Sequence, residues 1–144
     1  MKILVFRSGA FGDCLIITPL IRHLKAQGNE LVVVTSARGM KVFKNNPHIS
    51  ELVQHNEEVE IHKLSDEISR LQKKYKCDKV LDLSESVEVS LSLHPRSPEY
   101  KMSKPEKLAR YNRNFYEYSF EFSKEKWDSD MLVPELFFND NEIE

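Results

Sequence analysis

Four short runs of apolar residues alternate with segments of helical periodicity along the first half of the chain. The apolar runs are short enough for strands and cover residues 2–7, 30–35, 51–54 and 79–83. Helical segments follow the first three runs and cover residues 14–25, 39–45 and 65–76, the last with Ser65 as its N-cap. Strand, helix and strand in this order require a right-handed crossover, so the pattern predicts an α/β domain built on a parallel sheet.

Two segments admit more than one interpretation. Pro19 interrupts the first helical pattern, so either one helix kinks there or Thr18 caps a second helix that starts at Pro19. The apolar residues 15–17 would be unusual in an exposed loop, which favours the single kinked helix. Residues 87–93 alternate with period two like an edge strand, although the order of the preceding elements favours a helix there.

The last predicted helix begins at Ser103, because Ser103 and Glu106 have the spacing of a capping box. Apolar and aromatic residues then repeat every three or four positions, which predicts one long helix with an aromatic face on the sheet: Leu108, Tyr111, Phe115, Tyr118 and Phe122. We therefore assign residues 1–123 to one α/β domain. Residues 124–144 are assigned to an acidic tail or to the start of a linker.

Composition restricts the class of protein. The chain has 144 residues, 40% hydrophobic and 31% charged, which is typical of one soluble domain, and its net charge of −2 provides no overall attraction to nucleic acid. No apolar run approaches the roughly 18 residues of a spanning helix. Arg7 interrupts the first apolar run too early for a secretory leader, so a cytoplasmic location is predicted. Cys14 and Cys77 are interpreted as buried thiols, although Cys14 stands near a helix start, where a reactive thiol is the alternative.

The residues best suited to chemistry stand in the turn after the first strand: Arg7, Ser8, Gly9, Ala10, Phe11, Gly12 and Asp13. In α/β sheets this turn faces the ligand, and glycines allow a ligand to approach the backbone. Asp13 is either a catalytic carboxylate or a helix cap. The dinucleotide fingerprint is incomplete, because Ile16 stands near the place of the third glycine and Glu30 begins the second strand instead of ending it.

This opening resembles that of glycosyltransferase family nine, the ADP-heptose:lipopolysaccharide heptosyltransferases. The residues in register are Arg7, Gly9, Gly12, Asp13, Thr18, Pro19 and Leu20. Residues 46–53 are similar to that family's asparagine-proline turn and third strand, and residues 80–84 to its fourth strand and the following turn. The resemblance covers roughly the first 85 residues.

The resemblance implies a Rossmann-like parallel sheet flanked by helices, the acceptor-side half of a two-domain GT-B fold. It implies inverting transfer of a sugar from a nucleotide sugar such as ADP-heptose to a glycan or lipopolysaccharide-type acceptor, with Asp13 as the general base. Arg7 and residues 8–12 would line the acceptor site, and the alternative for Arg7 is an ion pair with a nearby carboxylate. Arg110 and Arg113 belong to a basic stretch that would bind anionic groups of the acceptor.

Neither the residues nor the resemblance indicates a metal or another cofactor. The nucleotide sugar would need a second domain, so the 144 residues alone are expected to be inactive. An exposed Phe11 would need a cover, such as a sugar ring or that second domain. The alternative function is a non-catalytic carbohydrate-binding or interaction module. The predicted partner is a glycan or glycolipid acceptor, with no nucleic acid and no membrane-spanning segment, and peripheral contact with a membrane stays open.

Overall fold

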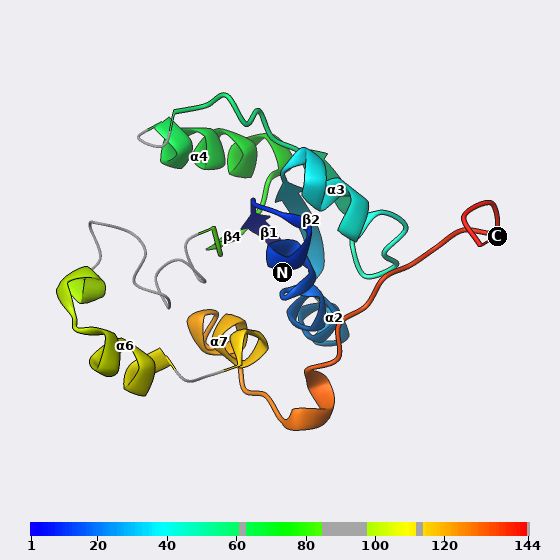
Figure 1. Ribbon diagram of the computed structural model, residues 1–144. Coiled ribbons are helices and arrows are strands. Elements are labelled where there is room, and N and C mark those ends of the chain that lie inside the picture. Colours follow the sequence, from blue (N-terminus) through cyan, green and yellow to red (C-terminus); the bar gives the residue numbers. More distant parts are fainter. Residues whose placement is uncertain (61–62, 85–97, 112–113, 144) are drawn as a thin grey trace.

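The computed structural model describes residues 1–60, 63–84, 98–111 and 114–143 (Figure 1). Four parallel strands form one sheet in the order β3-β2-β1-β4. Their bounds are β1 Lys2–Arg7, β2 Glu30–Thr35, β3 Glu51–Gln54 and β4 Lys79–Asp82. The predicted α/β fold with a parallel, Rossmann-like sheet is therefore confirmed.

Helices cover both faces of the sheet, which explains why β1 and β2 are almost continuously apolar. On one face Ile3, Val5, Leu31 and Val33 pack with residues of α2 (Thr18–Ala26), α3 (Ala37–Phe43) and α7 (Phe115–Phe122). On the other face Leu4, Phe6, Val32 and Val34 pack against Ile68 and Leu71 of α4 (Leu64–Tyr75). Figure 1 shows α4 and α2 on opposite sides of the strands.

The prediction of one kinked helix over residues 14–25 is wrong. The chain forms two helices, α1 (Phe11–Leu15) and α2, with Pro19 in the first turn of the second. Proline has no N–H to donate to the Leu15 carbonyl. The Thr18 hydroxyl donates to that carbonyl instead, at 2.9 Å, so the break between the helices leaves it hydrogen-bonded.

Two other helix starts differ from the prediction. The helix α3 begins two residues early, since the Ser36 hydroxyl accepts the Gly39 N–H at 3.1 Å. The helix α4 begins at Leu64, with Lys63 at the N-cap and no side-chain hydrogen bond, so Ser65 is not its cap.

The predicted single aromatic helix is two helices, α6 (Lys104–Tyr111) and α7. The Ser103–Glu106 capping box is confirmed, but the Asn114 side chain accepts the Tyr116 N–H and starts a new helix. The break places Phe120, outside the predicted stripe, in the core, whereas Leu108 is 62% exposed. Residues 87–93 lie outside the described residues.

Residues 124–143 contain the short 3₁₀ helix η3 (Ser129–Met131) and contact the domain along α2 and α3. A further 3₁₀ helix, η2 (Pro98–Lys101), precedes α6. Arg22 of α2 donates to the carbonyls of Met131 and Val133 and pairs with Glu135. Lys44, just after α3, pairs with Glu142. In the part of the chain that the structure describes, no helix has the length and apolar character needed to cross a membrane.

Gly39→Ala is expected to destabilise the protein by about 1–3 kcal/mol, because it overpacks the core. A Cβ at Gly39 would stand 1.9 Å from Thr35 Oγ1 and 2.8 Å from Cys14 Sγ, and Thr35 Oγ1 is held by a 2.7 Å hydrogen bond to the Arg7 carbonyl. Urea denaturation measures the loss. Gly12→Ala is the matched control: it is also helical, nothing lies within 4 Å of its added Cβ, and it should gain about 0.5–1 kcal/mol. An equal stability for the two variants would contradict the packing argument.

Candidate functional site

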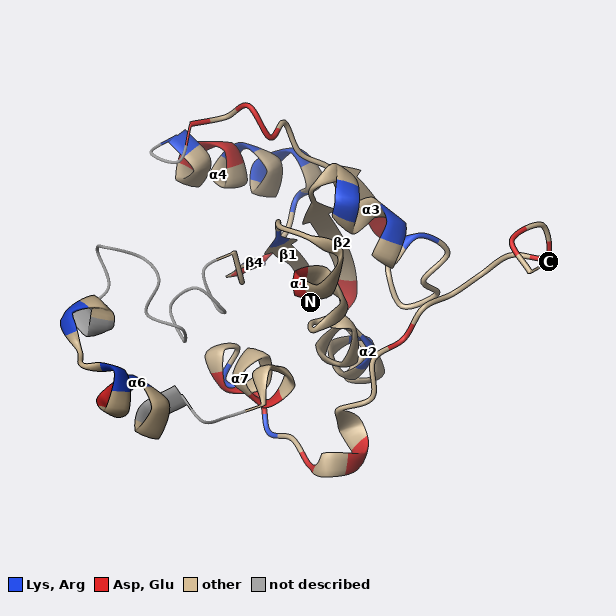
Figure 2. Ribbon diagram, viewed as in Figure 1, with Lys and Arg blue, Asp and Glu red and all other residues tan. Residues whose placement is uncertain are grey.

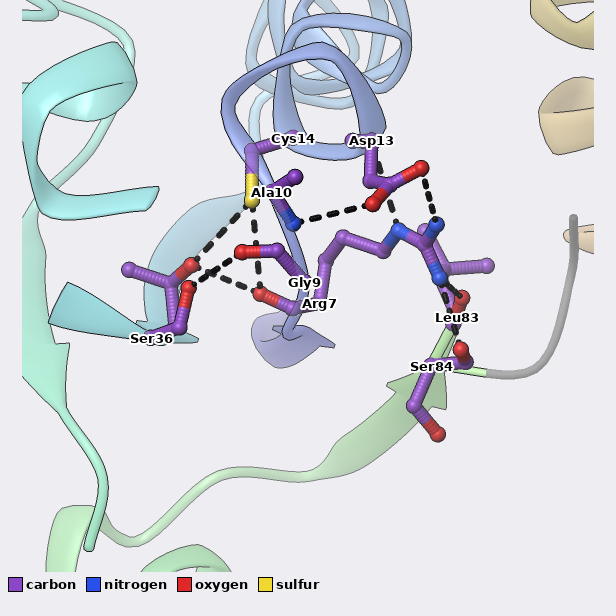
Figure 3. A network of polar contacts seen from close by, with 9 residues as sticks. Arg7, Gly9, Ala10, Asp13, Cys14, Ser36, Leu83 and Ser84 are labelled. Atoms are coloured by element: carbon purple, nitrogen blue, oxygen red, sulfur yellow. Dashed lines mark hydrogen bonds and ion pairs between the residues drawn. The ribbon is translucent and has the colours of Figure 1, made fainter. Parts of the chain in front are cut away.

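The turn after β1 lies where ligands bind in open α/β sheets. The strand β1 has β2 on one side and β4 on the other, so the loops after β1 and β4 leave from the point at which the strand order reverses. Residues 8–13 follow β1, and Leu83 and Ser84 follow β4. Figure 3 shows these two segments facing each other at the carboxyl ends of the strands.

The shape of this turn depends on Gly9, which has a φ of +122°. L side chains rarely adopt this value, and a Cβ here would stand 2.7 Å from Asp13 Oδ2. The Gly9 carbonyl accepts the Ser36 hydroxyl at 2.8 Å, so the turn is tied to the start of α3. Glycine is therefore needed both for the backbone conformation and for the close approach of Asp13.

Asp13 is the third residue of α1, and its carboxylate has two partners. Oδ2 accepts the N–H of Ala10, the N-cap residue, at 2.9 Å, and Oδ1 lies 3.6 Å from Arg7 Nη2. The side chain still exposes 33% of its surface. The structure thus shows the capping contact that was one of the two interpretations, and it leaves part of the carboxylate accessible from solvent.

The Arg7 side chain is fully buried at the end of β1. Its Nη1 donates to the carbonyls of Leu83 at 2.9 Å and Ser84 at 2.7 Å, and its Nε donates to the Asp13 carbonyl at 3.2 Å (Figure 3). Of the two roles weighed for Arg7, the structure shows pairing with a nearby carboxylate. The guanidinium therefore links β1 to α1 and to the residues after β4, and it holds the Asp13 carboxylate in one orientation.

The exposed part of the turn is formed by the first residues of α1. Phe11 is 44% exposed, and Ala10 and Gly12 are also exposed, whereas Ser8 is partly buried. An aromatic ring and a carboxylate two residues apart are groups with which proteins bind sugars, through ring stacking and hydroxyl hydrogen bonds.

The basic residues of the predicted acceptor site lie on and just after α6. Lys107 and Arg110 belong to α6, whereas Asn114 caps the separate helix α7. Lys107 donates to the Tyr100 carbonyl at 2.9 Å, and Arg113 lies outside the described residues. Figure 2 shows basic positions on α6 and acidic ones around η3.

His55 is a site residue that the sequence reasoning missed. Its Nε2 lies 3.0 Å from Ser8 Oγ, although the two residues are 47 positions apart, and its ring packs on Phe6 with centroids 5.1 Å apart. The available signal was its position directly after β3, since the carboxyl ends of parallel strands meet at one edge.

Both cysteines are buried, as predicted. Burial raises the pKa of the Cys14 thiol, and its Sγ lies 3.5 Å from Thr35 Oγ1 inside the core. A raised pKa and a buried position are typical of a structural thiol rather than a nucleophile. Within the described ranges, no group of three or more His, Cys, Asp or Glu side chains is placed to hold a metal ion.

Comparison with known proteins gives no match to this chain among family models, curated proteins or solved structures.

Proposed function

We propose that this chain is the acceptor-binding half of an inverting glycosyltransferase of the heptosyltransferase type, with Asp13 as the general base. The observation that carries the proposal is the accessible carboxylate of Asp13, held in a fixed orientation at the point where the strand order reverses. The resemblance of residues 1–24 to the start of family nine supports it. The activity requires a second α/β unit for the nucleotide sugar.

In the proposed reaction the acceptor hydroxyl donates a hydrogen bond to the Asp13 carboxylate. The hydroxyl proton passes to the carboxylate as its oxygen attacks the anomeric carbon of the sugar. The bond from that carbon to the nucleoside diphosphate breaks on the opposite side, and the configuration inverts. The Ala10 N–H and Arg7 hold the carboxylate in place, and its negative charge offsets positive charge that develops on the sugar.

Phe11 and the turn position the acceptor for the reaction at Asp13. The exposed ring offers a stacking surface for a pyranose, and the glycine turn lets the sugar approach the backbone. A cytoplasmic location and a lipopolysaccharide-type acceptor belong to the same proposal and rest on the resemblance.

A non-catalytic carbohydrate-binding module is the second candidate function. It is favoured by the two contacts of Asp13, because a carboxylate with a purely structural role would make the same ones. Both functions require the turn to bind a glycan. They differ in whether the charge of Asp13 matters for turnover.

Binding is tested by titrating ¹⁵N-labelled protein with the deacylated inner-core oligosaccharide of a lipopolysaccharide. We expect the largest amide shifts in residues 8–13. Neutral maltoheptaose is the control for the acceptor, and ADP-heptose alone should shift no amide of the turn, since the donor belongs to another domain. The absence of shifts in residues 8–13 at millimolar oligosaccharide would contradict both candidate functions.

A further inference from the structure

Ser8 and His55 form a hydrogen-bonded pair at the carboxyl edge of the sheet. Ser8 directly follows β1 and His55 directly follows β3, and β2 lies between these strands. The distance from Ser8 Oγ to His55 Nε2 is 3.0 Å. The serine is partly exposed, whereas the histidine is buried. A serine hydroxyl hydrogen-bonded to an imidazole is the arrangement of a nucleophile and its general base.

The contact of His55 Nδ1 determines which ring nitrogen carries the proton. Nδ1 is 3.1 Å from the carbonyl oxygen of Asn56, which can only accept a hydrogen bond. We therefore assign the proton of the neutral ring to Nδ1. The lone pair of Nε2 is then left to accept the Ser8 hydroxyl proton, as a general base must.

The imidazole of His55 is held in this orientation by its surroundings. The backbone N–H of His55 donates to the Thr35 carbonyl at 3.0 Å, and the His55 ring packs on the Phe6 ring at an interplanar angle of 53°. A general base loses little entropy in the reaction when its ring is already oriented. Strand pairing and core packing supply that orientation here.

The residue after the serine supplies a hydrogen-bond donor. Among the described residues, the Gly9 N–H donates to no backbone carbonyl. In serine nucleophiles that follow a strand, the N–H of the next residue stabilises the oxyanion. Ser8 and Gly9 stand in that order directly after β1.

We propose that Ser8 is a nucleophilic serine, activated by His55, that accepts the acyl group of a carboxylic ester. This activity is separate from the proposed sugar transfer, because it uses neither the charge of Asp13 nor a nucleotide sugar.

In the first step the Ser8 Oγ–C bond forms and the ester C–O bond breaks. The Ser8 proton moves to His55 Nε2 and from there to the departing alkoxide. In the second step water attacks the acyl carbon and gives its proton to Nε2. The Oγ–C bond breaks, and the proton returns to Ser8, which leaves a free acid.

The test is the reaction of the whole chain with a fluorophosphonate, followed by peptide mass spectrometry. We expect one adduct, on Ser8, with loss of fluoride, and a burst of p-nitrophenol from p-nitrophenyl acetate. Ser8→Ala should abolish both. His55→Gln keeps a hydrogen-bonding group near Ser8 but removes the base, so labelling should slow by about a hundredfold or more.

Ser84→Ala is the matched control, since Ser84 follows β4 at the same edge and its hydroxyl donates to the Asp82 carboxylate at 2.5 Å. In the Ser84→Ala variant, Ser8 should be labelled at the same rate as in the parent. No adduct on Ser8 of the parent, or labelling of His55→Gln at the parent rate in a folded protein, would overturn the proposal. The labelling site in the parent decides the matter if His55→Gln does not fold. Failure of the labelling leaves the sugar-transfer proposal unaffected, because the assay contains no sugar.

Discussion

Asp13→Asn is expected to lower the turnover of sugar transfer by about a hundredfold or more, in a protein that joins this chain to the donor domain of a heptosyltransferase. The amide cannot take the proton of the acceptor hydroxyl and cannot offset positive charge on the sugar. Acceptor binding should change little, since the lost interaction matters mainly in the transition state. Release of ADP from ADP-heptose measures the turnover.

The contacts of Asp13 add a second expectation, for stability. Asparagine keeps an oxygen that can accept the Ala10 N–H, but it removes the negative charge that faces the buried Arg7 guanidinium. Since Asp13 is one-third exposed, water weakens the pair, and we expect a loss of about 1–2 kcal/mol. Asp66→Asn is the matched control, because Asp66 is an exposed aspartate in the first turn of α4 and should affect neither property.

The two roles of Asp13 are separated by this comparison. Turnover within a few-fold of the parent, together with a reduced stability, would show that Asp13 is only a helix cap and a partner for Arg7. The non-catalytic binding module would then be the better interpretation.

Arg7→Met is expected to reduce the free energy of unfolding by about 3–5 kcal/mol. Methionine fills much of the space but donates no hydrogen bond. The Leu83 and Ser84 carbonyls would lose their Arg7 donors, and Asp13 would lose its cationic partner. Urea denaturation measures the change, and the amides of residues 8–15 should shift because α1 loses its tie to β4.

Arg22→Met is the control for this prediction. Arg22 also donates to two carbonyls and pairs with a carboxylate, but its side chain is partly exposed. Exposed pairs contribute little, so we expect a loss of about 1 kcal/mol or less, with release of the segment around Glu135. Equal losses for the two variants would show that the burial of Arg7 adds nothing to the stability of the protein.

Local patterns in the sequence determined the four strands and their parallel arrangement. A strand covered by helices on both sides must be apolar at nearly every position, as 30–35 is, and this property is readable without knowing its neighbours. The Ser103–Glu106 capping box was readable for the same reason, since both partners lie within one turn. The helix break at Thr18 was weighed but not favoured, and the break at Asn114 was missed, because apolar periodicity continues through both positions. Single hydrogen bonds decide where each helix starts.

Only the tertiary structure decided the environment of the candidate site. Asp13 was identified from its turn, but the burial of Arg7 depends on carbonyls 76 and 77 residues away. The pairing of Ser8 with His55 likewise depends on β3 joining the far side of β2, so that the ring reaches across the end of that strand. Strand order and register set these contacts, and because they arise from packing between distant segments, no local pattern of residues encodes them.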